Sequence, residues 1–386
     1  MGRDSWHLCM SEDGKRRREA KIDRQDLAKG KTALLEEVAK SKAHFGLPPD
    51  APVHTLYEAG RDGFWFARWL KNCGFSCIII DPSAILVDRK AKHRKNDAID
   101  SRALLELLVR HVTGDRPLDP VEIPPVEAED AREIGRLLGT LHGTRRSLAL
   151  RVQSLLWLQG IDDIYRTALP KTFDEMRTGD GRTLGPVLRA ELDQLCGQIE
   201  HLDRDICKLE DLRVAQIRKP VTSAQVKAQT LEMLVGIGPI GAWTLAHELF
   251  DWRIFQNGKH LGAFVGLSPT PFSSGTMERD QGISKAGSGP IRALMIELAW
   301  NWLRYQPESD LSKWYQTRFG DTAKRSKRVG IVALARKLLI LLWRYVTQGV
   351  VPAGALVKNV THEITAVRPR GANSRILYKS VVGVAA

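Results

Sequence analysis

The sequence predicts a mixed protein, with an α/β region first and a mostly helical chain after it. Short apolar runs alternate with helical patterns up to about residue 110, which is typical of a sheet covered by helices. A heptad repeat of apolar residues follows between Leu188 and Leu209, and a glycine turn between two helical patterns opens a third region near Gln229. The chain has 386 residues, which is too many for one typical core.

The first region, residues 1–110, carries strand and helix signals in turn. WHLCM is a strand candidate that the polar run EDGK ends. Residues 52–60 alternate as a strand that meets a glycine turn, and residues 61–74 have a helical pattern with a glycine at its end. Residues 76–82 hold a continuous apolar run, the mark of a buried strand.

The middle of the chain divides into a linker and a helical region. Residues 111–126 are rich in proline and polar residues, which predicts a linker, and residues 127–222 are mostly helical. Apolar residues recur there in alternating steps of four and three, as a heptad seam does: Leu188, Leu192, Leu195, Ile199, Leu202, Ile206 and Leu209. The seam predicts either an antiparallel hairpin within one chain or a coiled-coil arm between chains.

The third region, residues 229–348, is predicted to be mostly helical. Its most apolar stretch, VGIVALARKLLILLW, is interrupted by Arg336 and Lys337 and is too short to cross a bilayer. We therefore expect a buried amphipathic helix there. The tail, residues 349–386, has no strong pattern.

The composition indicates a polyanionic partner. The net charge is +13 and the pI is about 9.6, so nucleic acid is expected first and an anionic membrane surface second. The basic residues are clustered: Lys15–Arg18, Arg89–Lys95, Arg145 with Arg146, and Lys324–Arg328. The five cysteines form no metal-ligand pattern and no signal peptide is visible, which predicts reduced thiols in the cytoplasm.

Three carboxylates are candidate metal ligands. Asp97 and Asp100 lie three residues apart at a helix start, so both can face one point, although acids in a first turn also simply favour the helix dipole. Glu58 ends a predicted strand, and a carboxylate there with two more on a later helix is how RNase H-like and RuvC-like folds build two-metal sites. The basic side chains beside them are expected to hold a nucleic-acid backbone: Lys92, Arg94 and Lys95.

The third region offers a phosphate-binding turn. The run LVGIGPIGA resembles a helix-hairpin-helix, in which Gly236 and Gly238 would expose backbone N–H groups to a phosphate. A plain glycine-rich connection between two helices is the alternative.

The same region offers a hydroxyl nucleophile. PFSSG places Ser273 and Ser274 before a glycine in a predicted loop. A serine hydroxyl is a weak nucleophile without activation, and the nearby cations Arg279, Lys285 and Arg292 could stabilise a phosphoryl transition state. On spacing alone, Ser-Ser-Gly is most often only a loop.

Taken together and in this order, the motifs resemble one family. They are LYEAG, KNDAIDSRAL, LVGIGPIGAWTLAHEL, FVGLSPTPFSSG and GISKAGSGPIR. This order is similar to that of the DEDD-type insertion-sequence transposases of insertion-sequence family one-ten, also called bridge recombinases. The resemblance covers nearly the whole chain, apart from the extreme N-terminus and the tail after about Ile340.

The resemblance implies a RuvC-like N-terminal domain, a coiled-coil region and a C-terminal transposase domain. It implies a DNA transposase or recombinase that uses Mg²⁺ (or Mn²⁺), is guided by a bridge RNA and acts on donor and target DNA as a homo-oligomer such as a tetramer. It also implies a prokaryotic cytoplasmic protein, associated with the nucleoid while it functions. By the resemblance Glu58, Asp97 and Asp100 match the second to fourth acids, and Ser274 matches the serine that forms a covalent 5′-phosphoserine link to DNA.

The first acid of the family departs from the pattern. In the family this acid sits on the first strand, in a run like Gly-Ile-Asp, whereas MGRDSWHLCM starts just after that position and Asp4 falls too late to match. We expect either that this chain lacks its first few residues or that its metal site is short of one ligand. A site with only three acids would leave the metal with too few ligands, which would lower the activity of this chain.

Two other functions fit parts of the same pattern. A metal-dependent, structure-selective nuclease of the RuvC kind would use the acids alone and leave Ser274 idle. A non-catalytic remnant would only bind RNA or DNA. A covalent protein–DNA adduct on Ser274 distinguishes the transposase from both.

Overall fold

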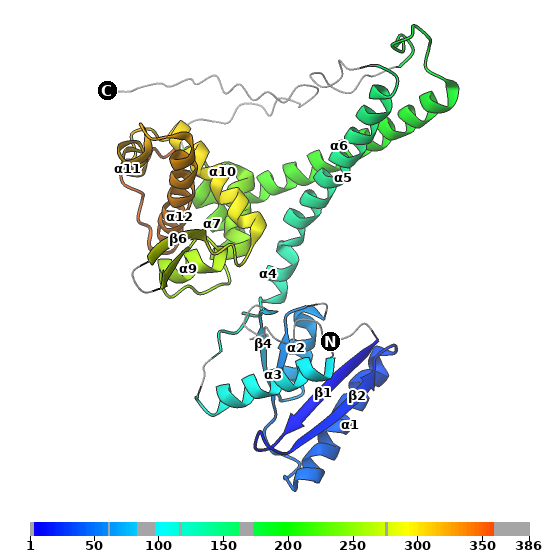
Figure 1. Cartoon of the computed structure of the whole chain (residues 1–386), viewed down its shortest axis with the longest axis vertical. Helices are drawn as coiled ribbons and strands as arrows, with labels where there is room; N and C mark the ends of the chain where they lie inside the picture. Colours follow the sequence, from blue (N-terminus) through cyan, green and yellow to red (C-terminus); the bar gives the residue numbers. More distant parts are fainter. Residues whose placement is uncertain are drawn as a thin grey trace. The chain divides into compact units, whose positions relative to one another are not determined.

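The computed structural model describes residues 4–60, 62–82, 97–115, 118–161, 173–274 and 277–358, and only the backbone for residues 97–98, 271–274 and 277–281. The chain divides into two compact units, Met1–Pro125 and Val126–Ala386. Figure 1 shows an α/β first unit and a mainly helical second unit. The broad expectation of an α/β region followed by helices is confirmed.

The first unit contains two small sheets and three helices. In one sheet β1 and β2 are antiparallel, with Ser5 opposite Asp23, and in the other β3 and β4 are parallel, with Glu58 opposite Ile80. The elements in chain order are β1 (Ser5–Ser11), β2 (Arg17–Asp23), α1 (Leu27–Phe45), β3 (His54–Glu58), α2 (Gly63–Asn72), β4 (Ser76–Ile80) and α3 (Asp97–Val112).

Aromatic side chains from both sheets and α2 make the core of this unit. Trp6 on β1 lies 4.8 Å from Phe66, and Tyr57 on β3 lies 5.5 Å from the same ring, centroid to centroid. The Trp6 indole N–H donates to Asp62 at 3.4 Å, and Arg24 forms an ion pair with the same carboxylate. Because a buried carboxylate needs a partner, Arg24 lets Asp62 anchor the start of β1.

The segment expected as a linker, residues 111–126, makes defined contacts with the first unit. Its first residues complete α3. Further on, Val121 N–H donates to Ile79 O at 2.7 Å, so the chain runs along β4, and Arg68 donates to Pro124 O at 2.8 Å. The first compact unit accordingly extends to Pro125.

In the second unit, two long helices pack against each other within the chain. After α4 (Val126–Ala131), α5 (Glu133–Trp157) packs on α6 (Pro186–Arg218). Every second seam position is fully buried, namely Leu192, Ile199 and Ile206, and Leu192 and Ile199 share a core cluster with residues of α5. The hairpin alternative is therefore observed, while contact between two chains stays a prediction.

A helical core completes the second unit. Its elements are α7 (Ser223–Glu232), α8 (Pro239–Leu245), a π-helical turn η4 (Ala246–Phe250), α9 (Gly258–Val265), β5 (Pro269–Ser274), β6 (Met277–Ile283), α10 (Gly289–Tyr305), α11 (Asp310–Phe319) and α12 (Lys324–Gln348). The stretch expected as a buried amphipathic helix is α12, whose Leu334, Leu338 and Leu342 are fully buried. Among the described residues no helix is both long and apolar enough to cross a membrane.

Candidate nucleic-acid-processing site

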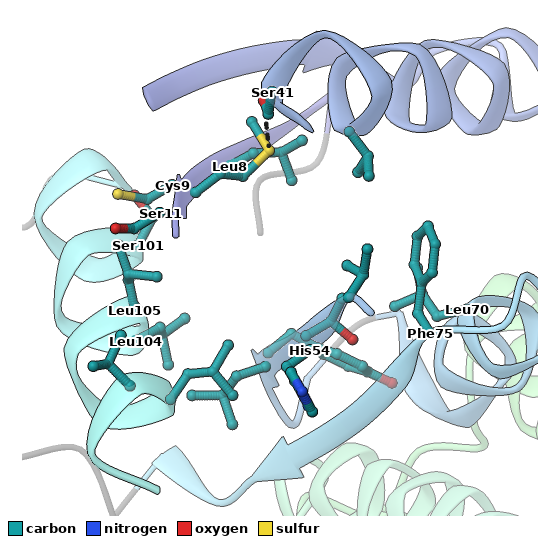
Figure 2. Close-up of a pocket in the computed structure, with 18 of the residues that line it drawn as sticks. Leu8, Cys9, Ser11, Ser41, His54, Leu70, Phe75, Ser101, Leu104 and Leu105 are labelled. Atoms are coloured by element: carbon teal, nitrogen blue, oxygen red, sulfur yellow. Dashed lines mark hydrogen bonds between the residues drawn. The ribbon is translucent and has the colours of Figure 1, made fainter. Parts of the chain in front are cut away.

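Two of the three candidate acids line one cavity in the first unit. The cavity has a volume of about 740 Å³, and both Glu58 and Asp100 are among its lining residues. Glu58 is the last residue of β3, and Asp100 lies in the first turn of α3. The strand end and the helix start thus place two carboxylates, 42 residues apart in sequence, on the lining of one cavity (Figure 2).

The structure describes only part of the remaining predicted site residues. Asp97 is the first residue of α3, one helical turn before Asp100, and only its backbone is described. The three basic residues expected to hold a nucleic-acid backbone lie outside the described residues: Lys92, Arg94 and Lys95.

The chemistry of the two visible carboxylates fits a hard divalent cation. Both side chains are half-buried, and within the described ranges neither Glu58 nor Asp100 forms an ion pair with a lysine or arginine. Other acids nearby do have such partners, as Asp62 has Arg24. Carboxylate oxygens without a protein cation are the ligands that Mg²⁺ prefers, so Glu58 and Asp100 are suited to hold it.

The two candidate nucleophiles lie on a strand rather than in the expected loop. Ser273 and Ser274 are the last two residues of β5, and Ser274 stands opposite Met277 in the antiparallel pairing with β6. Proline and serine disfavour strands, but the pairing with β6 supplies backbone hydrogen bonds that override the local preference. Ser274 is thereby the strand residue nearest the tip of the hairpin, and Arg279 lies on the facing strand, where only its backbone is described.

Arg292 holds the base of this hairpin, and its expected contact with a phosphate stays a prediction. Its guanidinium donates to Val265 O at 3.1 Å and to Lys285 O at 3.2 Å. It therefore joins the end of α9, the segment after β6 and the start of α10. Lys285 itself is exposed and has a positive φ of 55°, so its ammonium remains available for an anion.

The loop that follows the hairpin crosses the end of α9 very closely. An added Cβ at Gly287 would lie 1.9 Å from Phe264 O, and one at Gly266 would lie 2.0 Å from Ala286 O. Both residues also have positive φ values, of 88° and 74°. This crossing gives a physical reason for the glycines in FVGLS and KAGSG.

The two glycines of the predicted phosphate-binding turn have different surroundings. Gly236 has a φ of 90°, and a Cβ there would lie 3.3 Å from Tyr305 Cβ, so this glycine is needed for packing against α10. A Cβ at Gly238 would meet nothing within 4 Å, and Gly238 caps the start of α8. Gly238 is exposed and Gly236 is half-buried, and phosphate binding by this turn stays a prediction.

A set of hydrogen bonds around the same turn, here called the clasp, was not predicted from the sequence. The fully buried Gln306 donates to Val235 O at 2.9 Å and to Leu356 O at 2.8 Å, and it accepts from Leu356 N–H. Lys358 N–H donates to Met233 O at 2.7 Å, and burial lowers the pKa of the Lys358 ammonium. The start of the tail, which has no strong pattern, is thus hydrogen-bonded to this turn, although Leu356 and Lys358 are exposed.

Buried charges around η4 were also missed. Arg132 is 7% exposed and forms an ion pair with Glu248 at 3.1 Å, and its guanidinium lies over the Trp252 ring. His247 is buried and stacks on Trp243 with 3.7 Å between centroids, and burial lowers its pKa. A π-helical turn is rare and often marks a functional segment, but no sequence pattern indicates one here.

Exposed cations stand at the start of α12. The first turns of this helix carry no acid, and four basic side chains there are exposed: Lys324, Arg325, Lys327 and Arg328. Four like charges at the positive end of a helix dipole are unfavourable unless an anion is near. This cluster is therefore a surface that an anion can contact.

The chain is similar to known transposases. A model described as "Transposase IS116/IS110/IS902 family" matches residues 228–314, which include the hairpin with Ser274. The protein y4rJ of Sinorhizobium fredii, assigned as a transposase, is 38% identical over 318 residues and 80% of each chain. The transposase for insertion sequence element IS1328 of Yersinia enterocolitica is 27% identical over 83% of this chain and 92% of its own length. The transposase for IS1111A of Coxiella burnetii is 25% identical over 76% and 77%.

Proposed function

This chain belongs to the IS116/IS110/IS902 family of insertion-sequence transposases, and we propose that it recombines DNA through Ser274 and the acids Glu58, Asp97 and Asp100. In this proposal the serine hydroxyl attacks a DNA phosphodiester. The three carboxylates would hold Mg²⁺ or Mn²⁺ near the scissile phosphate. A guide RNA would select the DNA sequences.

One observation carries the acidic part of the proposal. Glu58 and Asp100 line the same cavity although they come from different elements, and neither has a cationic partner in the portion of the chain that is described. A divalent ion bound at this cavity would balance their negative charge. It would also lower the charge barrier to attack on a phosphate.

The position of Ser274 supports its role as nucleophile. It lies at the hairpin end of β5, inside the segment that the family model matches. Rigid strands position a reacting group better than loops do, and Arg292 fixes the base of this hairpin. The exposed Lys285 lies at the other end of β6, where it can contact the DNA backbone.

The proposed step exchanges one phosphoester for another. The bond from Ser274 Oγ to phosphorus forms as the bond from phosphorus to the 3′ oxygen breaks. The hydroxyl proton leaves to solvent, and the departing 3′ oxygen takes up a proton. The energy of the phosphodiester is kept in the 5′-phosphoserine link, so a free 3′-hydroxyl can later reverse the step and join new ends.

Replacing Ser274 tests the nucleophile. We expect Ser274→Ala to abolish recombination of a matched DNA pair, and Ser273→Ala, the adjacent matched control, to retain it. The measurement is strand exchange on labelled DNA, together with a denaturing gel for a protein–DNA adduct. Recombination by Ser274→Ala would refute this role, while metal-dependent cleavage without any adduct would favour the RuvC-like nuclease.

Replacing the carboxylates tests the metal site. We expect Glu58→Gln and Asp100→Asn to lower DNA cleavage by at least about a hundredfold, a loss typical of removed catalytic groups. Glu12→Gln is the control, since Glu12 lines the same cavity but forms an ion pair with Arg16 at 3.1 Å. Omission of the divalent ion should mimic the acid variants, and unchanged cleavage in either variant would refute their role.

Dependence on RNA is tested separately. The proposed guide RNA binds through its phosphates, for which the cations at the start of α12 are suited. We expect a charge-reducing variant with Lys324→Gln and Arg328→Gln to bind RNA or DNA more weakly and with a shallower salt dependence. Full recombination without any RNA would refute guidance but leave the roles of Ser274 and the acids intact.

A further inference from the structure

Arg336 of α12 is a half-buried cation whose charge is not compensated within the described part of the chain. Its Nε atom is buried there without a hydrogen-bond partner, and no described carboxylate forms an ion pair with its guanidinium. By contrast, the comparably buried Arg24 is paired with Asp62. An unpaired charge in a partly dehydrated site costs free energy, so an anion from outside the chain would stabilise Arg336.

Packing against α9 holds this guanidinium beside the base of the β5–β6 hairpin. A Cβ added to Gly262 of α9 would lie 3.0 Å from Arg336 Nε and 3.6 Å from Ser268 Oγ, so both groups border the same small space. Ser268 directly precedes β5, and its carbonyl accepts from the N–H of Ser284, just after β6, at 2.9 Å. In the described structure the Ser284 hydroxyl oxygen is buried without a hydrogen-bond partner. A guanidinium and two hydroxyls thus gather where the hairpin joins α9 and α12.

The end of α9 has other groups that satisfy its carbonyls. A cation near a helix C-terminus usually compensates the carbonyls that have no donor within the helix. Here Arg292 donates to Val265 O at 3.1 Å, and Leu267 N–H donates to Gly262 O at 2.9 Å. Because these contacts already cap α9, a purely structural role as a helix cap does not account for Arg336.

A second cation lies next to the same site. Lys285 follows Ser284 in the chain, its side chain is exposed, and its N–H donates to Gly266 O at 3.2 Å. The acids of β6, Glu278 and Asp280, are in register with residues of β5 nearer the tip of the hairpin. An anion at the base of the hairpin would therefore have two cations nearby.

We propose that Arg336, Ser268 and Ser284 form a binding site for one phosphate of a DNA backbone, with Lys285 at its edge. The planar guanidinium matches the geometry of phosphate oxygens, and a serine hydroxyl can donate a further hydrogen bond to them. This inference rests on the proposed function, which supplies DNA as the ligand.

The proposed phosphate site is separate from the reacting phosphate. Ser274 lies six residues beyond Ser268 along the chain. A strand of that length spans about 20 Å, which equals about six base pairs of duplex DNA. Arg336 is therefore proposed as a positioning residue, which holds the hairpin on the DNA while Ser274 acts elsewhere on the same duplex.

The salt dependence of DNA binding tests the contact without any chemical step. We expect Arg336→Gln to weaken binding of duplex DNA about tenfold at about 0.1 M salt, and to reduce the slope of log K against log salt by about one. Arg344→Gln is the control, because Arg344 is an exposed arginine further along the same helix, and it should leave the slope unchanged. Arg336→Lys keeps the charge without the planar fork, so it should restore the slope but only part of the affinity.

Gly262→Ala tests the position of the site while every charge is kept. The added methyl group would lie 3.0 Å from Arg336 Nε, so it would fill the space that the guanidinium shares with Ser268. We expect weaker DNA binding but an unchanged or higher unfolding temperature, because alanine favours a helix interior over glycine. Binding equal to that of the unaltered chain would contradict the assigned position.

A scan of the DNA with single uncharged methylphosphonate linkages identifies the phosphate. On the DNA that forms the Ser274 adduct, the unaltered chain should lose affinity at one linkage about six base pairs from the adduct. Arg336→Gln should be insensitive to that same linkage, because the contact is already lost. If the two losses add, a free anion or a water molecule occupies the site and the proposal is overturned.

The outcomes distinguish this inference from the proposed function. A normal Ser274 adduct together with an unchanged salt slope in Arg336→Gln would overturn the phosphate site alone. A reduced slope without any adduct would support the phosphate site and refute the role of Ser274. Failure of the unaltered chain to bind duplex DNA would overturn both.

Discussion

The first unit and the helical core of the second unit differ in how completely their interiors are filled. In the helical core, α10 and α12 contribute fully buried side chains such as Leu298, Trp302 and Leu338. In the first unit, the aromatic cluster around Phe66 adjoins a cavity of about 740 Å³. The part that carries Ser274 is thus closely packed, whereas the part that carries Glu58 and Asp100 is open beside its acids.

The difference indicates that the two parts tolerate change differently. In a filled core an altered side chain must displace its neighbours, since native packing is close to that of a crystal. Beside a cavity the same change meets empty space. Matched substitutions in the two parts, each followed by hydrogen exchange of peptides from its own unit, test whether the two interiors differ in this way.

The largest expected effect comes from the glycines with positive φ. We expect Gly287→Ala to cost about 4 kcal/mol of folding free energy, because its Cβ would overlap Phe264 O at 1.9 Å on top of the backbone strain. Gly46→Ala, in the first unit, has a similar φ of 70° but no atom within 4 Å of the added Cβ. It should cost only about 1 kcal/mol.

Denaturant unfolding of both variants measures these costs. Gly197→Ala, in the middle of α6 with nothing within 4 Å of the new Cβ, is the control and should be neutral or slightly stabilising. Equal losses for Gly287→Ala and Gly46→Ala would contradict the assigned close crossing.

A smaller difference is expected from matched leucine truncations. Leu298→Ala should cost about 3 kcal/mol, because Leu298 is 3% exposed in a filled core and its removal leaves a new cavity. Leu104→Ala should cost about 1 kcal/mol or less, because Leu104 already borders a cavity and is only half-buried. If Leu104→Ala were as costly as Leu298→Ala, the cavity would be closed in solution.

A pH dependence is expected in the helical core. Burial lowers the pKa of His247, so the unfolded chain binds a proton at pH values where the folded core does not. Stability should therefore fall as the pH drops below the ordinary histidine pKa of about 6.5, by at most about 1.4 kcal/mol per pH unit, until the lowered pKa is reached. His247→Gln should flatten this slope between about pH 7.5 and 5.5.

Chemical unfolding midpoints across that range provide the measurement. His201→Gln is the control, because His201 is exposed on α6 and its loss removes an imidazole without touching the core. A slope that is unchanged in His247→Gln would assign the acid sensitivity of the core to other groups.

The sequence predicted the parts of both units that depend on local pattern. The apolar run in β4 and the heptad positions of α6 were recognisable because each is visible in the local order of apolar residues. Strand β2 was missed because RREAKID is mostly charged and only Ile22 is buried. This segment forms a strand because it pairs with β1. Ser274 was expected in a loop for the same reason, since the pairing of β5 with β6 is a tertiary property.

The candidate site was predictable as a set of residues but not as an arrangement. Glu58 and Asp100 were recognised from a strand end and a helix start, and the structure brings both to one cavity. The cavity itself, the clasp by Gln306 and the reach of Arg292 to Lys285 O depend on contacts between segments distant in sequence. Periodicity carries no information about such contacts.

The smallest expected effects come from two buried tyrosine hydroxyls, one in each part. Tyr57 in the first unit donates to Gly63 O at 2.7 Å, and Tyr315 in the helical core donates to Lys327 O at 3.3 Å. Tyr57→Phe should cost about 1 kcal/mol, since it leaves a carbonyl without this donor, and Tyr315→Phe should cost less because its longer bond is weaker. The leucine truncations are expected to cost more in the helical core, whereas the tyrosine substitutions are expected to cost more in the first unit. The first unit, whose interior is not filled, would therefore depend relatively more on its polar contacts. Thermal unfolding of the two variants measures both costs, and a larger loss for Tyr315→Phe would show that the helical core dominates stability in polar contacts as well as in packing.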